Sequence, residues 1–308
     1  MPEGGHELRD LLDRIPVLHG LSRTVVELAG GLTNQNLRVT TSDGDYVVRR
    51  FRGDPDLLGI DRDAEHANSV AAAEAGVGAP VLDYLPDLGV LVIGYLDGRT
   101  YDNLAFAEPG VLGRAAEAIR RLHGGPRFTG DFDMFTRQAR YLHTVREEGY
   151  PLVEGYVDLD DQFQRVGRAL AVRAGPTVPC NNDLLAGNFV DDGERVWLID
   201  YEYSGNNDAC FELGNTSTEC DLDDDQVEAL VTAYFGGTGR SRRSSLARVR
   251  LQALVSAYGW SLWGAIQAAA SSIDFDFDSW GRERFDKAAR GLTSDALPAL
   301  LEEATRAD

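Results

Sequence analysis

The chain has 308 residues, about twice the roughly 150 residues of an average domain, which predicts one large two-lobed unit or two domains. Hydrophobic residues make up 43% and charged residues 26%, the proportions of a globular protein and not of a disordered chain. With 30 Lys+Arg against 50 Asp+Glu, the formal net charge of -20 argues against nucleic acid or an anionic membrane as a partner. An anionic ligand would need a divalent cation or a local group of arginines and backbone N–H groups.

The cysteines and the N-terminal residues indicate a compartment. Cys180, Cys210 and Cys220 form no CxxC pair, which favours free thiols in a reducing environment. The first residues lack the basic-then-apolar order of a signal peptide, and no stretch offers 18 uninterrupted apolar residues. We therefore expect a cytoplasmic protein that neither crosses nor is targeted to a membrane.

The first third of the chain carries mainly β-strand signals. Alternating and β-branched runs predict five strands and Ala-rich spacing predicts one helix, which Asp61 can cap. The turn signals, such as Asp43-Gly44, are those of hairpins, so the sheet should be antiparallel. The strands are expected at 24–28, 36–40, 46–51, 81–85 and 90–93, and the helix between 61 and 78. These residues predict a sheet lobe over 1–96 with one embedded helix.

The remainder of the chain turns helical after a hinge-like segment at 96–98. Apolar residues at helical spacing predict helices over 112–122, 159–172, 225–235, 244–270 and 280–289. The predicted fold is therefore α+β and bilobal, with a C-terminal lobe over 97–308 that is mainly helical.

One segment carries the pattern of phosphoryl transfer. Asp183 stands five residues before Asn188, and a hydrophobic strand over 196–199 leads directly to Asp200. Such a reaction needs a carboxylate that accepts the proton of the attacking hydroxyl, and an amide and a second carboxylate that hold Mg²⁺. Asp183 would be the base, and Asn188 and Asp200 the metal ligands. DxxxxN alone is common by chance, because Asp and Asn also build turns.

The predicted sheet lobe supplies the groups that would bind phosphate. Arg49 ends a strand and Glu65 lies in the embedded helix, so a cation and the carboxylate that positions it come from the expected places. The segment around Gly30 and Gly31 is a turn of small residues whose backbone N–H groups could approach phosphate. By itself, this segment is more typical of a plain hairpin turn.

Three blocks of sequence resemble the choline/ethanolamine kinase family, within the aminoglycoside-phosphotransferase and protein-kinase-like superfamily. They read GGLTNQN with DGDYVVRR, NNDLLAGN with LIDYEYSGNNDACFELGN, and WSLWGAIQAAASSIDFDF followed by RERFD. The resemblance implies a protein-kinase-like fold with ATP and Mg²⁺ between the lobes. It places Thr33 and Asn34 in the phosphate-binding turn, and the adenine against a hinge at Gly94, Tyr95 and Leu96.

Aromatic residues provide the clue to the phosphate acceptor. Trp260 and Trp263 share a helical face and Trp280 follows, an arrangement that suits a quaternary ammonium, which aromatic faces can bind without hydrogen bonds. Without the kinase pattern, tryptophans at this spacing would be read as core. The resemblance places these three residues in an aromatic pocket and Glu219 at its acidic position. Ethanolamine would require more hydrogen-bond acceptors, so the pattern favours choline.

Further residues complete the hypothesis and its alternatives. Glu202 is expected to support Asp200 or a second metal beside the acceptor, and His123 to be structural. The family usually has His where this chain has Asn181, which could keep a hydrogen bond in a smaller volume. The sequence predicts a kinase that transfers the ATP γ-phosphate to choline or ethanolamine. The alternatives are an aminoglycoside or other small-molecule kinase, and a silent protein that binds a nucleotide or an amine.

Overall fold

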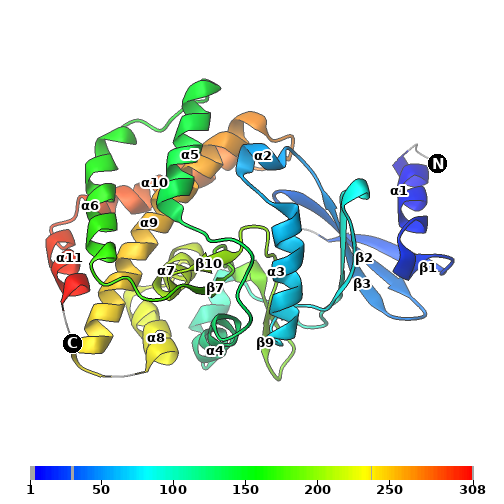
Figure 1. The fold of residues 1–308 in the computed structure, drawn as a ribbon, viewed down its shortest axis with the longest axis horizontal. Helices are drawn as coiled ribbons and strands as arrows, with labels where there is room; N and C mark the ends of the chain where they lie inside the picture. Colours follow the sequence, from blue (N-terminus) through cyan, green and yellow to red (C-terminus); the bar gives the residue numbers. More distant parts are fainter. Residues whose placement is uncertain (1–3, 29–30, 237, 307–308) are drawn as a thin grey trace.

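The computed structural model describes residues 4–28, 31–236 and 238–306. A twisted β-sheet lies at one end of the molecule and a bundle of helices at the other, so the two parts are segregated along the long axis (Figure 1). The predicted α+β class, with a sheet lobe followed by a helical part, is confirmed. The position of the boundary at residue 96 stays a prediction.

The sheet is antiparallel throughout, with the strand order β1-β2-β3-β5-β4. The five strands predicted from sequence are β1 Arg23–Leu28, β2 Asn34–Thr41, β3 Asp45–Phe51, β4 Val81–Leu85 and β5 Val90–Gly94. In this register Arg49 on β3 lies opposite Asn36 on β2 and Leu91 on β5. Arg49 is therefore held on a central strand, where its backbone is paired on both sides.

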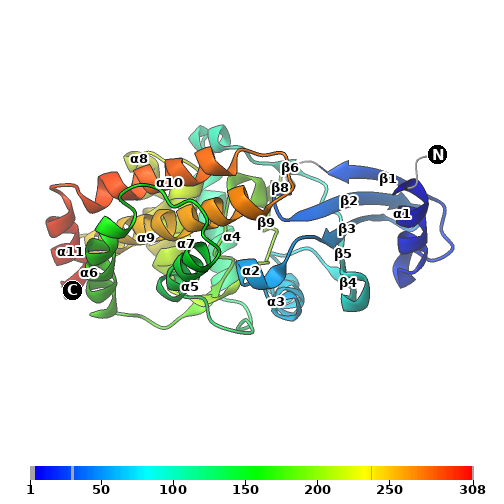
Figure 2. The same ribbon diagram turned by 90° about the horizontal axis from the view of Figure 1, so that it is seen from above.

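Apolar side chains of the central strands form the core of this lobe. Leu37, Val39, Val48, Val90 and Val92 are buried, and Leu12 and Ile15 from the N-terminal segment pack against them. Helix α1, Gly4–Asp13, therefore covers one face of the sheet, as Figure 2 shows. Sequence patterns did not predict this helix.

The embedded helix α3, Arg62–Glu74, begins where the sequence predicts. The Asp61 side chain accepts a hydrogen bond from the Ala64 N–H at 3.0 Å, which caps the helix. The short helix α2, Pro55–Leu58, connects the sheet to α3. The N-terminal cap fixes the first turns of α3, and these turns carry Glu65 toward Arg49.

The helical part is organised around one long helix, α9, which runs through its centre (Figure 2). Helices α10, α7 and α5 pack against it. The helices are α4 Val111–His123, α5 Met134–Glu147, α6 Asp160–Ala171, α7 Ala209–Glu219, α8 Asp224–Phe235, α9 Arg240–Ala270, α10 Phe277–Leu292 and α11 Leu297–Thr305. Helices α5, α7 and α11 were not predicted. Within the ranges that the structure describes, no helix is long and apolar enough to cross a bilayer.

Short strands and 3₁₀ turns in the helical part carry the loops of the site. The strands are β6 Arg99–Thr100, β7 Val178–Cys180, β8 Phe189–Asp191, β9 Val196–Leu198 and β10 Gly205–Asn207. The 3₁₀ turns are η1 Pro16–Leu18, η2 Pro86–Leu88, η3 Asn103–Ala107, η4 Val157–Leu159 and η5 Ala186–Asn188. Because β8 and β9 form a hairpin, the residue before β8 lies beside the residue after β9, and the Ile199 N–H donates to the Asn188 carbonyl at 3.0 Å. Asn188 and Asp200 are thus brought together by strand pairing.

Candidate active site

The loop between β7 and β8 carries the predicted base. Asp183 follows β7 by three residues, and its backbone carbonyl accepts a hydrogen bond from the Asn188 side-chain amide at 2.8 Å. Asp200 follows β9 and has a positive φ of 67°, an uncommon conformation for a residue that is not glycine. The structure therefore brings Asp183, Asn188 and Asp200 to one place, as the sequence predicts.

Asn181 joins the two strands that carry these groups. Its side-chain N–H donates to the carbonyl oxygens of Ile199 at 3.1 Å and Asp200 at 2.8 Å, and its Oδ1 accepts from the Asp183 N–H at 3.1 Å. The residue is completely buried. Asn181 thus holds the backbone of both Asp183 and Asp200 at the position where the family usually has histidine.

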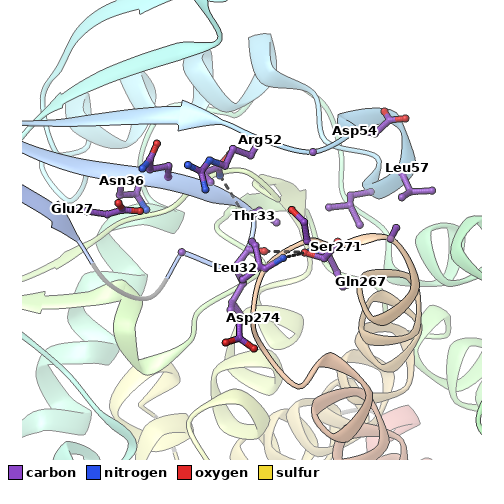
Figure 3. Close-up of a pocket in the computed structure, with 18 of the residues that line it drawn as sticks. Glu27, Leu32, Thr33, Asn36, Arg52, Asp54, Leu57, Gln267, Ser271 and Asp274 are labelled. Atoms are coloured by element: carbon purple, nitrogen blue, oxygen red, sulfur yellow. Dashed lines mark hydrogen bonds between the residues drawn. The ribbon is translucent and has the colours of Figure 1, made fainter. Parts of the chain in front are cut away.

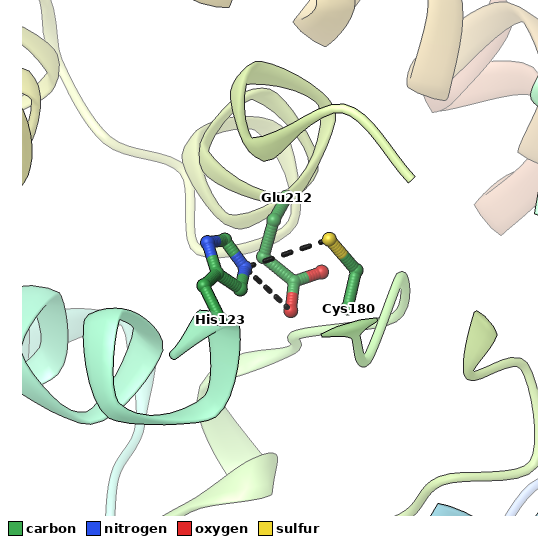
Figure 4. Close-up of side chains that lie close together, drawn as sticks. All are labelled: His123, Cys180 and Glu212. Atoms are coloured by element: carbon green, nitrogen blue, oxygen red, sulfur yellow. Dashed lines mark hydrogen bonds and ion pairs between the residues drawn. The ribbon is translucent and has the colours of Figure 1, made fainter. Parts of the chain in front are cut away.

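The buried carboxylate of Glu212 supports the loop that carries Asp183. The two oxygens of Glu212, on α7, accept the backbone N–H groups of Asn181 and Asn182, each at 2.7 Å. His123 lies on the other side, with its Nε2 3.8 Å from the carboxylate and 3.5 Å from Cys180 Sγ (Figure 4). His123, Cys180 and Glu212 present atoms of types that ligate metal ions, but both Glu212 oxygens already serve the loop backbone. Their arrangement supports the loop, and the structural role expected for His123 agrees with it.

Arg49 forms the centre of an ion-pair network. Its Nη1 donates to Glu65 at 2.8 Å and to Asp200 at 2.6 Å, and its Nε donates to Asn36 at 3.3 Å. Burial opposes the charged form, but Asp200 and Glu65 outweigh it and keep the pKa of Arg49 above its ordinary value. The predicted Arg49–Glu65 pair exists and extends directly to a predicted metal ligand.

A cleft of about 350 Å³ opens between the sheet and the helical part beside this network. Residues predicted for nucleotide, phosphate and metal line it, namely Gly31, Arg49, Gly94, Tyr95, Leu96, Asn188 and Asp200. A Cβ on Gly31 would collide with the carbonyl oxygen of Asn34, so a glycine is required in this turn. Gly30 lies outside the described residues.

Glu202 ties the β1–β2 turn to the helical part. Its carboxylate accepts hydrogen bonds from Thr33 at 2.7 Å and Asn34 at 2.8 Å, and it is paired with Arg62 at 3.2 Å. Burial, and then Asp200 and Glu65, raise the pKa of Glu202 to about 7. The side chains of Thr33 and Asn34, predicted to lie in a phosphate-binding turn, therefore hold the turn in place through Glu202.

The donor atoms fit a hard divalent cation. The Asn188 amide nitrogen is engaged with the Asp183 carbonyl, which leaves its Oδ1 as the ligand atom, and Asp200 presents a carboxylate beside it. Both residues line the same cleft, and Mg²⁺ prefers carboxylate and amide oxygens. The residues that would hold Mg²⁺ are therefore Asn188 and Asp200.

A second, smaller cavity of about 80 Å³ adjoins the predicted catalytic groups. Its lining combines polar side chains, three of them predicted to be catalytic, with aromatic ones: Leu32, Thr33, Asp183, Leu185, Asn188, Asp200, Glu202, Tyr203, Trp260, Trp263 and Trp280. The Trp263 and Trp280 rings are 5.0 Å apart, and the Trp263 N–H donates to the Tyr203 hydroxyl at 2.8 Å. The three tryptophans thus share one cavity with Asp183. Trp260 and Trp263 also pack into the core, as the alternative interpretation expects, and their role in binding an acceptor stays a prediction.

Asp183 is surrounded by other acids. Burial raises its pKa well above the ordinary value, and Glu219, Asp200 and Glu202 raise it further, whereas Arg284 lowers it. A raised pKa makes a carboxylate a better proton acceptor once it is ionised. This environment suits a general base.

Glu219, predicted at the acidic position of the acceptor site, lies at the end of α7 and is paired within the protein. Its two oxygens accept from the Nε and Nη2 of Arg284, on α10. Glu219 is not among the residues that line the small cavity. The sequence interpretation did not include this partner.

A larger cleft of about 750 Å³ lies outside the small cavity (Figure 3). It shares Leu32 and Thr33 with that cavity, and Gly31 and Asn36 with the cleft of about 350 Å³, which is the predicted nucleotide cleft. The Gln267 side chain donates to the Leu32 carbonyl at 3.2 Å and joins α9 to the β1–β2 turn.

Several side chains of the site were missed in the sequence. Arg62 follows the helix-capping Asp61 and stands three residues before Glu65, a spacing that signals an ion pair on a helix. Tyr203 lies within the DYEYS segment that follows the predicted strand. Glu212 gave no local signal, because the backbone N–H groups that it accepts are 30 and 31 residues away. Arg284 lies four residues after Trp280, but its acidic partner Glu219 is 65 residues away.

Comparison with known proteins places this geometry in a context. Residues 24–246 match the family described as Phosphotransferase enzyme family. A choline/ethanolamine kinase family protein from Mesorhizobium loti, solved by crystallography, is 34% identical, with a TM-score of 0.85 over 98% of this chain and 99% of that one.

Two further relatives differ in the amine that their names give. Ethanolamine kinase 1 of Mus musculus is 24% identical over 294 residues, which cover 83% of this chain and 80% of that protein. The choline kinase LicA from Streptococcus pneumoniae shares the fold, with a TM-score of 0.79 at 22% identity over 93% of this chain and 99% of that one. LicA has also been solved in complex with AMP.

Proposed function

The chain belongs to the choline/ethanolamine kinase family, within the phosphotransferase enzyme family, and on this basis we propose that it transfers the γ-phosphate of ATP to the hydroxyl of choline. One observation carries the proposal: Asp183 and the three tryptophans Trp260, Trp263 and Trp280 line the same small cavity, next to the nucleotide cleft. A small molecule that carries a hydroxyl group and a methylated cation would fit this cavity, with the hydroxyl group at Asp183 and the cation against the tryptophans.

The proposed mechanism depends on position and charge. Asp183 orients the acceptor hydroxyl and takes its proton as the oxygen attacks phosphorus. Arg49, braced by Glu65, donates to phosphate oxygens through Nη2, which takes no part in its bonds to Glu65, Asp200 and Asn36. Mg²⁺ held by Asn188 and Asp200 would neutralise charge on the β- and γ-phosphates. The adenine is assigned to the wall formed by Gly94, Tyr95 and Leu96.

The hydrogen-bond partners around the cavity favour choline over ethanolamine. Both Glu202 oxygens accept from Thr33, Asn34 and Arg62, and the Tyr203 hydroxyl accepts from Trp263. A primary ammonium must satisfy three N–H donors, whereas a trimethylammonium has none and gains about 2 kcal/mol or more from a desolvated aromatic face. The aromatic wall therefore suits the methylated amine.

The size of the cavity argues against an aminoglycoside as the acceptor. A cavity of about 80 Å³ suits a small amino alcohol, whereas a larger acceptor would extend into the outer cleft of about 750 Å³. A polycationic sugar with several rings would need the outer cleft and several free carboxylates. Aminoglycoside phosphorylation is therefore the weaker alternative.

The contacts of Asn181 argue against a silent binding protein. Replacement of the family's histidine would impair catalysis if the backbone around Asp183 and Asp200 lost its hydrogen bonds to this side chain. Asn181 keeps such bonds, because it donates to the Asp200 carbonyl and accepts from the Asp183 N–H. The base, both proposed metal ligands and the Arg49–Glu65 pair are present. Turnover is therefore expected.

The test is ADP release with Mg²⁺ and ATP, with choline, ethanolamine and an aminoglycoside as parallel acceptors. We expect choline to give the highest kcat/KM, and Asp183→Asn to lower acceptor-dependent turnover by about 10²–10⁴-fold, the usual contribution of a general base. Choline binding without choline-dependent ADP release would contradict the proposal and support the silent alternative.

A further inference from the structure

Arg284 lies between Glu219 and the ring of Trp280, which is the one of these three residues that lines the small cavity. Its Nε donates to Glu219 at 3.1 Å, and its Nη2 donates to the other oxygen of the same carboxylate. Its Cζ lies 3.3 Å from the centre of the Trp280 ring, and its Nη1 donates to the Trp280 carbonyl at 3.3 Å. One guanidinium therefore holds both Glu219 and Trp280.

This contact is buried, so both side chains have lost most of their water. Arg284 is 7% exposed and Glu219 is 5% exposed. A two-point Arg–carboxylate pair uses the planar geometry of both groups, which lysine cannot reproduce. Because each Glu219 oxygen accepts a guanidinium N–H, the carboxylate is neutralised by a resident cation.

The same contact fixes the ring that faces the acceptor. Trp280 is half-buried and lines the small cavity, and one face of its indole is covered by the guanidinium. Arg284 stands one helical turn after Trp280 on α10, so the stacking requires no change in the helix. The cavity meets only the part of the indole that Arg284 leaves uncovered.

We propose that Arg284 is a positioning residue that sets the amine selectivity of the acceptor site, because it holds Trp280 in place and keeps Glu219 from a ligand's N–H groups. This inference rests on the proposed function and extends it. With Arg284 in place, the cation of the acceptor meets aromatic faces. Without it, Glu219 is an unpaired carboxylate next to the space that the guanidinium leaves, where a primary ammonium that enters this space can donate to it.

A primary and a quaternary ammonium differ in the contacts through which a protein can bind them. A primary ammonium gains most from a carboxylate oxygen, whereas a quaternary ammonium cannot donate to one and depends on the position of the rings. Removal of Arg284 should therefore weaken binding of the methylated cation and strengthen binding of the primary one. Removal of the charges of both Arg284 and Glu219 should weaken binding of the methylated cation without strengthening binding of the primary ammonium.

The experiment compares wild type with Arg284→Gln, Arg284→Lys, Glu219→Gln and the double variant Glu219→Gln/Arg284→Gln. Arg282→Gln is the matched control, because Arg282 lies on the same helix, is exposed and pairs only with the exposed Asp278 among the salt bridges described. For each protein, kcat and KM are measured with choline and with ethanolamine, and thermal melting establishes that the variant is folded.

For Arg284→Gln we expect KM for choline to rise about tenfold with a smaller change in kcat, and the choline-to-ethanolamine ratio of kcat/KM to fall about tenfold. Arg284→Lys should show a partial shift, and the double variant should lose choline affinity without gaining ethanolamine turnover. Unchanged selectivity in Arg284→Gln and Arg284→Lys would overturn the proposal. An equal gain of ethanolamine turnover in the double variant would also overturn it, since Glu219 would then not be its source.

A binding measurement separates failure of this inference from failure of the proposed function. Tetramethylammonium and methylammonium are titrated by isothermal calorimetry and by tryptophan fluorescence, neither of which needs turnover. If wild type turns over no amine but binds tetramethylammonium more tightly, and Arg284→Gln reverses that preference, the inference stands while the proposed function fails. If wild type binds neither ion, or Arg284→Gln keeps the wild-type preference, the inference is overturned. Should Arg284→Gln fail to fold, Arg284→Lys and the double variant supply the comparison.

Discussion

The side-chain amide of Asn181 donates to the backbone carbonyl of Asp200 at 2.8 Å. Asp200 has a positive φ, a strained backbone conformation for a residue other than glycine. Without the Asn181 amide, the backbone carbonyl oxygen of Asp200 would lose this donor inside the protein. One hydrogen bond therefore fixes the conformation of a proposed metal ligand. A histidine could also make this bond, so the exchange of His for Asn preserves the contact.

The first prediction concerns this contact. Asn181→Ala removes the bonds to Ile199 and Asp200 and leaves buried carbonyls unsatisfied, at a cost of about 1–3 kcal/mol. We expect kcat to fall about 10–100-fold, with little change in KM for choline. Asn181→His should change kcat by less than about fivefold in steady-state assays. A large increase in kcat for Asn181→His would instead mean that asparagine at position 181 impairs phosphoryl transfer.

The second prediction concerns the pair behind the phosphate site. Glu65→Gln keeps the volume of the side chain but removes the charge that Arg49 and Arg62 share. Arg49 should then lean toward Asp200, and we expect kcat/KM for ATP to fall about 10–100-fold, in line with the loss of a buried charged hydrogen bond. Glu74→Gln, at the exposed end of the same helix, is the control and should leave kcat/KM for ATP unchanged.

Much of this site could be predicted because its groups lie in short segments that can be recognised locally. Asp183 and Asn188 share one loop and Asp200 follows a hydrophobic strand, and this spacing suggests their roles once Arg49 and Glu65 are read with it. The hairpin of β8 and β9 then places Asn188 beside Asp200 without help from the rest of the chain. The five strands of the sheet lobe were equally accessible, because turns and alternation mark each one.

The supporting groups could not be predicted, because they depend on packing between distant elements. Helix α7 is buried on nearly every side, so it shows no amphipathic pattern, and Gly214 and β-branched residues weaken its helix signal. Glu212 and Glu219 both lie on α7, and their partners come from the catalytic loop and from α10. The Arg284–Glu219 pair, 65 residues apart, gave no trace in the sequence.

The third prediction tests the support that α7 gives to the catalytic loop. Glu212→Gln replaces one carboxylate oxygen with an amide group, which cannot accept a backbone N–H, so one of the two bonds to Asn181 and Asn182 is lost. We expect kcat to fall at least tenfold and urea unfolding to show a loss of about 1–3 kcal/mol. Glu228→Gln, which removes only a half-exposed pair with Arg242, is the control and should change stability by less than about 0.5 kcal/mol.

The fourth prediction is a dependence of stability on pH that arises from the thiols. Burial raises the pKa of Cys180, Cys210 and Cys220 above the ordinary value, and nearby carboxylates raise it further. The folded state therefore keeps protons that the unfolded state releases above about pH 8.5. The stability that these thiols contribute is fully present below this pH and is lost as pH rises toward the folded pKa.

Between pH 8.5 and 9.5 the free energy of unfolding should fall by about 1 kcal/mol for each thiol, mostly before the tyrosines titrate near pH 10. Urea unfolding across this range measures the slope, and each Cys→Ala variant should reduce it by about a quarter, because tyrosines whose pKa burial raises supply the remainder. In the native protein at pH 8, the three buried thiols should also fail to react with a disulfide reagent until urea unfolds the chain. A triple Cys→Ala variant that keeps the full slope would show that other groups cause it. Rapid reaction of Cys180 in the native protein would show that the site around it opens in solution.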